Sequence, residues 1–307
     1  MTSIVFPGQG SQFKGMAKDF NDNFNIAKMA FEEIEEYTKI DLRDIIFNNL
    51  ENKLNLTQFT QLCIFATSYA IFKTFFKEKN LNLKDINVMM GHSLGEYTAL
   101  ACSNKIGLRD CCEILKKRSE LMNNAVTPNE TGMAALIGKD SEYIKKIIYD
   151  NKLNIEIAND NSPMQIVISG SKTDIIEAKD IFLKNNIKKF VELSVSAAFH
   201  SKFMFKAQEK LSKEIEKLQF IENDIQIISN YDANILNDTK SIKQNLQKQM
   251  ANTVNWTKSI KKLHETGEKN IIEIGPSKVL SGLISRISKN FDIVSINEIS
   301  DLKNVSN

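Results

Sequence analysis

Short apolar runs alternate with amphipathic stretches along most of the chain, and this alternation predicts an α/β fold. Helical patterns fill residues 12–80 after a short opening strand, and further helices are predicted at 94–103 and 108–123. Five apolar runs have the length and composition of buried strands: 3–6, 86–90, 225–229, 270–274 and 292–296. Because strands and helices alternate, we expect a mostly parallel sheet with helices on both faces.

The middle of the chain follows a different order. The elements predicted there are strands at 133–137, 155–158, 165–169 and 189–195 and helices at 142–150 and 174–184, with a loop at 159–163. Either Ser171 or Thr173 would cap the second of these helices. The order strand-helix-strand-strand-helix-strand over about sixty residues is the ferredoxin-like one. We therefore expect a ferredoxin-like small subdomain at 130–193, inserted into a large α/β subdomain formed by 1–129 and 194–307.

Composition gives no overall signature of a nucleic-acid or membrane partner, although local basic patches remain open, and it does not indicate a function. The 307 residues include 40 basic and 38 acidic ones, and this balance gives no overall charge signature for nucleic acid or an anionic membrane. The four cysteines lie in apolar helical stretches without metal-binding spacing, a pattern typical of a reducing compartment. No signal peptide and no stretch long enough to span a membrane is apparent. We expect a cytoplasmic monomer that binds no metal, membrane or nucleic acid.

A candidate nucleophile stands in the segment Gly91-His92-Ser93-Leu94-Gly95, which matches GxSxG between a predicted strand and a predicted helix. The two glycines permit a tight turn that exposes the Ser93 hydroxyl at the carboxyl end of the sheet. The Leu94 amide opens the helix, where the helix dipole favours an oxyanion. A chance match occurs in roughly a few per cent of chains of this size, and the strand–helix context makes it rarer. Ser93 is therefore the predicted nucleophile.

The general base is sought among three histidines. His92 adjoins the nucleophile on the same turn, so its side chain should point elsewhere. His264 lies among lysines and glutamates, which is typical of an exposed helix face. His200 follows the last strand of the insert, and with Ser93 present it is the predicted base rather than a structural histidine between subdomains.

The group that orients the base is left open by the sequence. Glu273 and Asp232 are the acidic candidates, although Glu273 could simply end a strand. A backbone carbonyl is the alternative.

Three segments, in this order, carry a family resemblance: Phe6-Pro7-Gly8-Gln9-Gly10-Ser11-Gln12, Gly91-His92-Ser93-Leu94-Gly95-Glu96-Tyr97 and Ala198-Phe199-His200-Ser201. Supporting segments are Lys117-Arg118, Asn161-Ser162-Pro163, Gln249-Met250-Ala251-Asn252 through Trp256, and Glu273-Ile274-Gly275-Pro276. Together they span nearly the whole chain. They resemble the malonyl-CoA:acyl-carrier-protein transacylases, acyltransferases of fatty-acid and polyketide synthesis.

The resemblance implies a hydrolase-like α/β domain with a ferredoxin-like insert, in agreement with the pattern of elements. It also implies a role for each matching residue. Ser93 would take the acyl group and His200 would be the base. The amides of Gln9 and Leu94 would form the oxyanion hole. The backbone carbonyl of Gln249 would orient His200, which would explain why no acid stands out.

By the same resemblance, Arg118 would bind the free carboxylate of a malonyl group, through two parallel hydrogen bonds. Composition alone would favour a surface arginine beside Lys116 and Lys117. Phe199 before the histidine and Leu94 after the serine are similar to the malonyl-selective pattern, and a bulky Phe199 would exclude a methyl group at the α-carbon.

The expected reaction moves malonyl from malonyl-CoA to the phosphopantetheine thiol of an acyl carrier protein, through a malonyl-serine intermediate and without a bound cofactor. The segments 56–61 and 196–204 look most similar to free-standing acyltransferases that serve trans-acyltransferase polyketide synthases. The housekeeping transacylase of fatty-acid synthesis is the alternative. A serine acyl-thioester hydrolase, which has no need of Arg118, and a non-catalytic carrier-docking subunit are the other rivals. Leu62 and Thr253 depart from prolines common in relatives, both outside the predicted catalytic positions.

Overall fold

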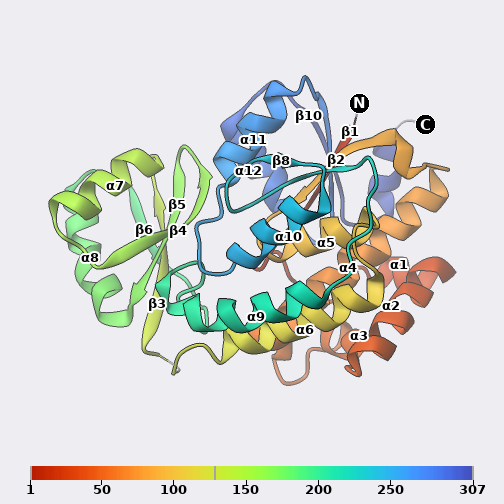
Figure 1. Ribbon diagram of the computed structural model, residues 1–307, viewed down its shortest axis with the longest axis horizontal. Coiled ribbons are helices and arrows are strands. Elements are labelled where there is room, and N and C mark those ends of the chain that lie inside the picture. The colour runs from red at the N-terminus through yellow and green to blue at the C-terminus, as the bar shows by residue number, and fades with distance from the viewer. Residues whose placement is uncertain (1, 128, 306–307) are drawn as a thin grey trace.

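Two sheets organise the chain in the computed structural model, which describes residues 2–127 and 129–305 (Figure 1). The larger sheet has the strand order β10-β9-β1-β2-β7-β8, and the smaller one has the order β4-β5-β3-β6. In Figure 1 the smaller sheet and its two helices form a separate lobe on the left. The predicted α/β class, with a mostly parallel sheet and a small antiparallel subdomain, is confirmed.

The larger sheet is parallel except at one edge. Its strands are β1 (Thr2–Phe6), β2 (Ile86–Gly91), β7 (Gln226–Ile228), β8 (Ile235–Leu236), β9 (Asn270–Ile274) and β10 (Asp292–Ile296). β1 lies between β2 and β9 and pairs with both in parallel. The two-residue β8 pairs antiparallel with β7 and was not predicted, since two residues carry no detectable pattern.

Helices cover both faces of this sheet, as the alternation of elements predicts. They are α1 (Lys18–Asn23), α2 (Asn25–Thr38), α3 (Leu42–Phe47), α4 (Thr57–Glu78), α5 (Leu94–Cys102), α6 (Leu108–Asn123), α9 (Phe205–Lys217), α10 (Thr239–Lys248), α11 (Trp256–Glu265) and α12 (Val279–Ile287), with short 3-10 turns η1 (Lys53–Asn55), η2 (Leu83–Asp85), η3 (Lys202–Met204) and η4 (Ile299–Asn304). Successive residues of a strand face opposite sides. Ile4 and Phe6 therefore join the core with α2, α4, α5 and α6, whereas Val5 packs with α11 and α12.

Helix α4 is largely buried, in keeping with its dense apolar sequence. All four cysteines are free and buried on α4, α5 and α6. No helix in the described ranges is both long and apolar enough to cross a bilayer.

The small subdomain has the predicted ferredoxin-like order of elements. These are β3 (Thr131–Ile137), α7 (Ser141–Asp150), β4 (Ile155–Ser162), β5 (Gln165–Ser171), α8 (Lys172–Lys184) and β6 (Lys189–Glu192). Ser171, one of the two predicted caps, accepts a hydrogen bond from the backbone N–H of Asp174 at the start of α8. The helices pack on one face of the sheet around Ile144, Ile168 and Phe182.

The predicted loop at 159–163 is wrong. β4 continues to Ser162, and only Pro163 and Met164 connect it to β5. The register of β4 against β5 shifts twice, leaving Ala158 and Asn161 as extra residues. Such bulges redirect a strand. Two of the polar residues that suggested a loop, Asp160 and Asn161, are buried and hydrogen-bond to Thr257 and His92 of the large subdomain. The predicted strand at 189–195 is shorter, since β6 ends at Glu192.

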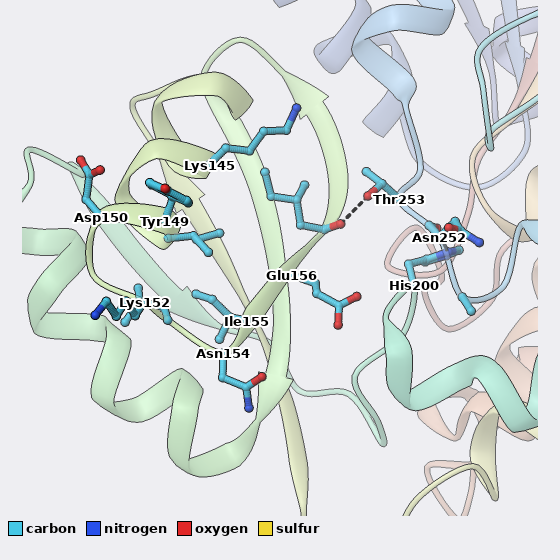
Figure 2. Close-up of a pocket in the computed structure, with 14 residues that line it drawn as sticks. Lys145, Tyr149, Asp150, Lys152, Asn154, Ile155, Glu156, His200, Asn252 and Thr253 are labelled. Carbon is cyan, nitrogen blue, oxygen red and sulfur yellow. Dashed lines mark hydrogen bonds between the residues drawn. The ribbon is translucent and has the colours of Figure 1, made fainter.

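The seam between the subdomains is a short β-interaction. The backbone N–H of Val254 donates to Ala158 at 2.9 Å, and Asp160 N–H donates to Val254 at 3.0 Å. The Thr253 hydroxyl donates to the Ile157 carbonyl at 2.6 Å, drawn as a dashed line in Figure 2. Thr253 thus takes part in the seam.

Candidate active site

The turn between β2 and α5 holds Ser93 in a strained conformation, with φ 54° and ψ −106°. A Cβ at Gly91 would overlap the backbone of Gly95, and a Cβ at Gly95 would overlap the Phe6 carbonyl on β1. Only glycine fits at either position, so the strand can turn sharply into the helix. The Ser93 hydroxyl consequently projects from the carboxyl end of the parallel sheet.

Asn230, which sequence reasoning missed, clamps this turn. Its side-chain oxygen accepts the Ser93 backbone N–H at 2.6 Å, and its side-chain nitrogen donates to the Gly91 carbonyl at 2.7 Å. Asn230 follows β7, the neighbour of β2. A polar residue at the carboxyl end of a parallel strand was the signal available in the sequence.

The structure brings Ser93 and His200 together, although 107 positions separate them in the chain. Ser93 Oγ lies 2.8 Å from His200 Nε2. His200 Nδ1 lies 3.1 Å from the Gln249 carbonyl and 3.1 Å from the Asn252 carbonyl. Two acceptors at Nδ1 require the proton there, which leaves Nε2 free to accept the serine proton. Burial, with the nearby Arg118 charge, lowers the pKa of His200 to about 3, so the imidazole is neutral.

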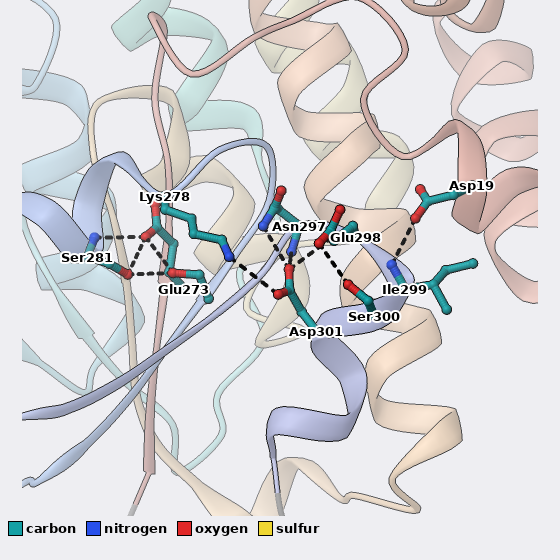
Figure 3. A network of polar contacts seen from close by, with 10 residues as sticks. Asp19, Glu273, Lys278, Ser281, Asn297, Glu298, Ile299, Ser300 and Asp301 are labelled. Atoms are coloured by element: carbon teal, nitrogen blue, oxygen red, sulfur yellow. Dashed lines mark hydrogen bonds and ion pairs between the residues drawn. The ribbon is translucent and has the colours of Figure 1, made fainter.

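The two acidic candidates lie elsewhere. The Glu273 carboxylate accepts the backbone N–H groups of Leu280 and Ser281 and thereby caps α12. Figure 3 shows its contact with Ser281. The same figure shows the separate Asp301 network that anchors the C-terminal turn η4. The Asp232 carboxylate accepts from Asn234 and Asn245. Of the possibilities left open by the sequence, the backbone carbonyls are therefore the groups that contact His200.

Arg118 is buried beside the serine rather than exposed, with 1% of its surface accessible. Its Nη2 donates to Ser93 Oγ at 2.9 Å and to Gln249 Oε1 at 3.0 Å. Its Nη1 donates to Gln61 Oε1 at 2.5 Å, and the Tyr97 ring lies 5.2 Å from the guanidinium carbon. The alternative of a surface arginine is wrong, because the inward face of α6 carries Arg118 into the core.

A small cavity of about 100 Å³ adjoins Ser93. Its walls include every residue that the family resemblance assigned to the site except Gln249: Gln9, Ser93, Leu94, Arg118, Phe199 and His200. Gln9 follows β1, and Leu94 is the first residue of α5, where the backbone N–H has no partner within the helix. A cavity of this size can hold a few water molecules, which suits a small acyl group.

A wider cleft of about 1020 Å³ also adjoins His200. In Figure 2, His200 and Asn252 stand at one end of the cleft, and Tyr149, Asp150 and Lys152 stand at the other. His200 lines both the small cavity and the open cleft.

The other two histidines have the environments that the sequence predicts. His92 Nε2 lies 2.8 Å from the Asn161 side chain, and the ring packs near Trp256. His264 is exposed on α11 and contacts Asn290. Sequence reasoning missed Gln61 and Glu96, both buried around Arg118 and Ser93. Spacing could have indicated Glu96, which lies one helical turn after Ser93.

Comparison with known proteins places the chain in a well-populated group. A family model described as an acyl transferase domain matches residues 4–303. The chain is similar to the malonyl CoA-acyl carrier protein transacylase of Bacillus subtilis, with 35% identity over 299 residues that cover 96% of this chain and 93% of the relative.

Solved structures agree. An acyl carrier protein S-malonyltransferase from Vibrio cholerae aligns with a TM-score of 0.93 and 34% identity over 99% of both chains. A malonyl-transacylase in complex with a type II polyketide-synthase acyl-carrier protein aligns with a TM-score of 0.93 and 32% identity, covering 99% of this chain and 98% of that one.

Proposed function

The chain belongs to the acyl transferase domain family, and from that premise we propose that it moves a malonyl group from malonyl-CoA to an acyl carrier protein through Ser93. The observation that carries the proposal is that His200 and Arg118 both contact the Ser93 hydroxyl. Ser93 Oγ lies 2.8 Å from the neutral imidazole of His200 and 2.9 Å from the buried guanidinium of Arg118.

In the first half-reaction His200 Nε2 takes the Ser93 proton while Oγ attacks the thioester carbonyl carbon. The N–H groups of Gln9 and Leu94 would stabilise the oxyanion. As the carbon–sulfur bond breaks, the leaving thiolate of coenzyme A takes the proton from His200. A malonyl ester remains on Ser93.

In the second half-reaction the phosphopantetheine thiol of the carrier gives its proton to His200, and the sulfur attacks the ester carbonyl. When the bond to Oγ breaks, Ser93 regains the proton from His200. The Gln249 and Asn252 carbonyls support both steps, because they accept Nδ1–H and favour the imidazolium that forms transiently.

Arg118 would select the malonyl group. Without substrate, Arg118 Nη2 donates a hydrogen bond to the Ser93 hydroxyl. When substrate binds, the malonyl carboxylate would be a charged acceptor for the same guanidinium. An acetyl group would leave the buried charge unpaired, at a cost of about 2–5 kcal/mol. Phe199 lines the same cavity and would restrict branching at the α-carbon.

The cleft beside His200 is the proposed approach for the pantetheine arm. It is open enough for a flexible chain, and the imidazole that must exchange a proton with the thiol forms part of its wall. The small acyl cavity leaves little room for water once it is filled, which would protect the ester from hydrolysis.

Intact-protein mass spectrometry tests the proposal. Malonyl-CoA should add one malonyl group to the parent protein but none to Ser93→Ala, and acetyl-CoA and methylmalonyl-CoA should load poorly. Arg118→Ala should lose the preference for malonyl over acetyl. Release of free malonate in place of malonyl-carrier would indicate a hydrolase instead. No mass gain with any thioester would indicate a non-catalytic subunit.

We further propose that the carrier belongs to a trans-acyltransferase polyketide synthase, on the strength of segments 56–61 and 196–204. The fatty-acid enzyme is the alternative, and kcat/KM with carriers of both kinds separates the two. A cytoplasmic location is proposed with it, since all four cysteines are free thiols. A monomer is proposed as the oligomeric state. Light scattering with and without carrier tests the monomer.

A further inference from the structure

Glu96 is a buried acid next to the nucleophile that none of the steps above uses. It lies in the first turn of α5 and is 2% exposed. A glutamate three residues after the residue that precedes a helix often folds back onto that residue's N–H. Here that N–H belongs to Ser93, and Asn230 already accepts it. The Glu96 carboxylate is therefore available for other partners.

Those partners converge on a single carboxylate oxygen. Glu96 Oε2 accepts from the side-chain Nε2 of Gln249 at 2.8 Å and from the backbone N–H of Asn230 at 3.2 Å. The same Nε2 donates to the Ser93 carbonyl at 2.8 Å. At the other end of the amide, Gln249 Oε1 accepts from Arg118 Nη2 at 3.0 Å.

The two ends of the Gln249 amide are not interchangeable in this setting. A guanidinium only donates, and Glu96 Oε2 acts as an acceptor for both the Gln249 amide and the Asn230 N–H. Rotating the amide by half a turn would place its NH₂ group against Arg118 and its oxygen against Glu96 and the Ser93 carbonyl. All three hydrogen bonds would be lost at once. The acceptor at Glu96 therefore helps to keep Oε1 facing Arg118.

The orientation matters because Arg118 Nη2 serves two acceptors, Gln249 Oε1 and Ser93 Oγ. With Nη1 held by Gln61, these contacts fix the direction of the guanidinium. Binding a carboxylate through two parallel hydrogen bonds depends on that direction. We propose that Glu96 is a positioning residue that orients the Gln249 amide and, through it, sets the Arg118 guanidinium for malonyl. This inference rests on the proposed role of Arg118.

The hydrogen bond from Gln249 to Glu96 requires a side chain at position 96 that is long enough to place an acceptor oxygen there, and it does not require a charge. Burial raises the pKa of Glu96 to about 7, while Arg118 and Asp232 are the charged groups that act on it. Both hydrogen bonds use Oε2, so a proton on Oε1 would leave them in place. An uncharged acceptor at the same position should serve equally well, whereas a shorter carboxylate should not.

Two conservative variants separate reach from charge. Glu96→Gln keeps the length and an acceptor oxygen but removes the charge. Glu96→Asp keeps the charge but withdraws the acceptor by one methylene. The readout is the ratio of malonyl to acetyl loading on Ser93, measured with saturating thioesters and by kcat/KM. Glu96→Asp should lower the ratio about tenfold with acetyl loading retained, and Glu96→Gln should keep the parent ratio within about threefold.

Glu113→Gln and Glu113→Asp on α6 are matched controls, since Glu113 is an exposed partner of Arg109. If Glu96→Gln loses the preference for malonyl loading over acetyl loading and Glu96→Asp keeps it, the inference is overturned, because the charge of Glu96 rather than its length would then set the preference. Equal losses of malonyl and acetyl loading would assign Glu96 a structural role, and unchanged ratios in both variants would assign it none. If the parent shows no preference for malonyl, or if Arg118→Ala has the same preference as the parent, the proposed role of Arg118 is wrong. That result does not depend on the Glu96 variants.

Discussion

At the scale of single residues, the candidate site combines backbone strain with buried titratable groups. Ser93 and His200 both have positive φ, 54° and 55°. Each such conformation costs about 1–3 kcal/mol, which the surrounding hydrogen bonds must offset. Asn230 does so for Ser93, and the carbonyls of Gln249 and Asn252 hold the His200 ring.

The buried titratable groups predict an unusual pH dependence of stability. The pKa of His200 falls from 6.5 to about 3 on folding, so the unfolded chain binds more protons between those values. This group makes the free energy of unfolding decrease as the pH falls from 6.5. The pKa of Glu96 rises from 4.5 to about 7, so its contribution is complete below pH 4.5 and is lost as the pH rises through 7. Between pH 4.5 and 6.5 the two slopes oppose each other, each about 1.4 kcal/mol per pH unit.

Urea unfolding of the parent and of Glu96→Gln between pH 4.5 and 6.5 measures the pH dependence of the free energy of unfolding. Glu96→Gln removes one of the two opposing slopes, so its stability should rise with pH more steeply than that of the parent. Parallel curves for the two proteins would contradict the assignment.

At the scale of elements, the site depends on the tight junction of β1, β2 and α5. Gly95→Ala should destabilise the protein by about 2 kcal/mol or more and abolish Ser93 loading, because the added methyl group would meet the Phe6 carbonyl. Thermal unfolding and malonyl loading measure the two effects.

Gly282→Ala is the matched control on α12. An added Cβ there would meet nothing within 4 Å, and Gly282 lies inside a helix. This substitution should stabilise the protein by about 0.5–1 kcal/mol and leave loading unchanged. If the two substitutions had similar effects, the close contact between Gly95 and the Phe6 carbonyl would not be what determines the geometry of the turn.

At the scale of the whole molecule, the site lies where the two subdomains meet, and their seam should control access of water. The Thr257 hydroxyl on α11 donates to the buried Asp160 carboxylate of β4 at 2.5 Å. Thr257→Val should destabilise the protein by about 1–3 kcal/mol and should raise the share of malonyl-enzyme lost to hydrolysis.

The single tryptophan, Trp256, is fully buried near His92, so its fluorescence reports on unfolding of the seam. The partition between malonyl-carrier and free malonate reports on water. Thr266→Val is the control, since that hydroxyl bonds a carbonyl of its own helix. A rise in hydrolysis that is equal in both variants would show that the seam does not govern water entry.

The sequence by itself determined the order of elements and the nucleophile turn, because both depend on neighbours along the chain. Hydrophobic periodicity reports which face of a strand or helix is buried, and glycine spacing around Ser93 reports a turn that no other residue permits. The ferredoxin-like order followed from the same local patterns.

Only the tertiary structure decided what surrounds the serine. Asn159–Ser162 has a loop-like composition, yet it lies in strand β4 because the seam supplies partners for its polar groups. Arg118 follows two lysines and is nonetheless buried, held by Gln61 and Gln249 from other elements. His200 likewise contacts the Gln249 carbonyl rather than Glu273, because α10 ends just before Gln249 and places that carbonyl beside the imidazole. Each of these contacts joins residues far apart in the chain, and local patterns carry no information about such distances.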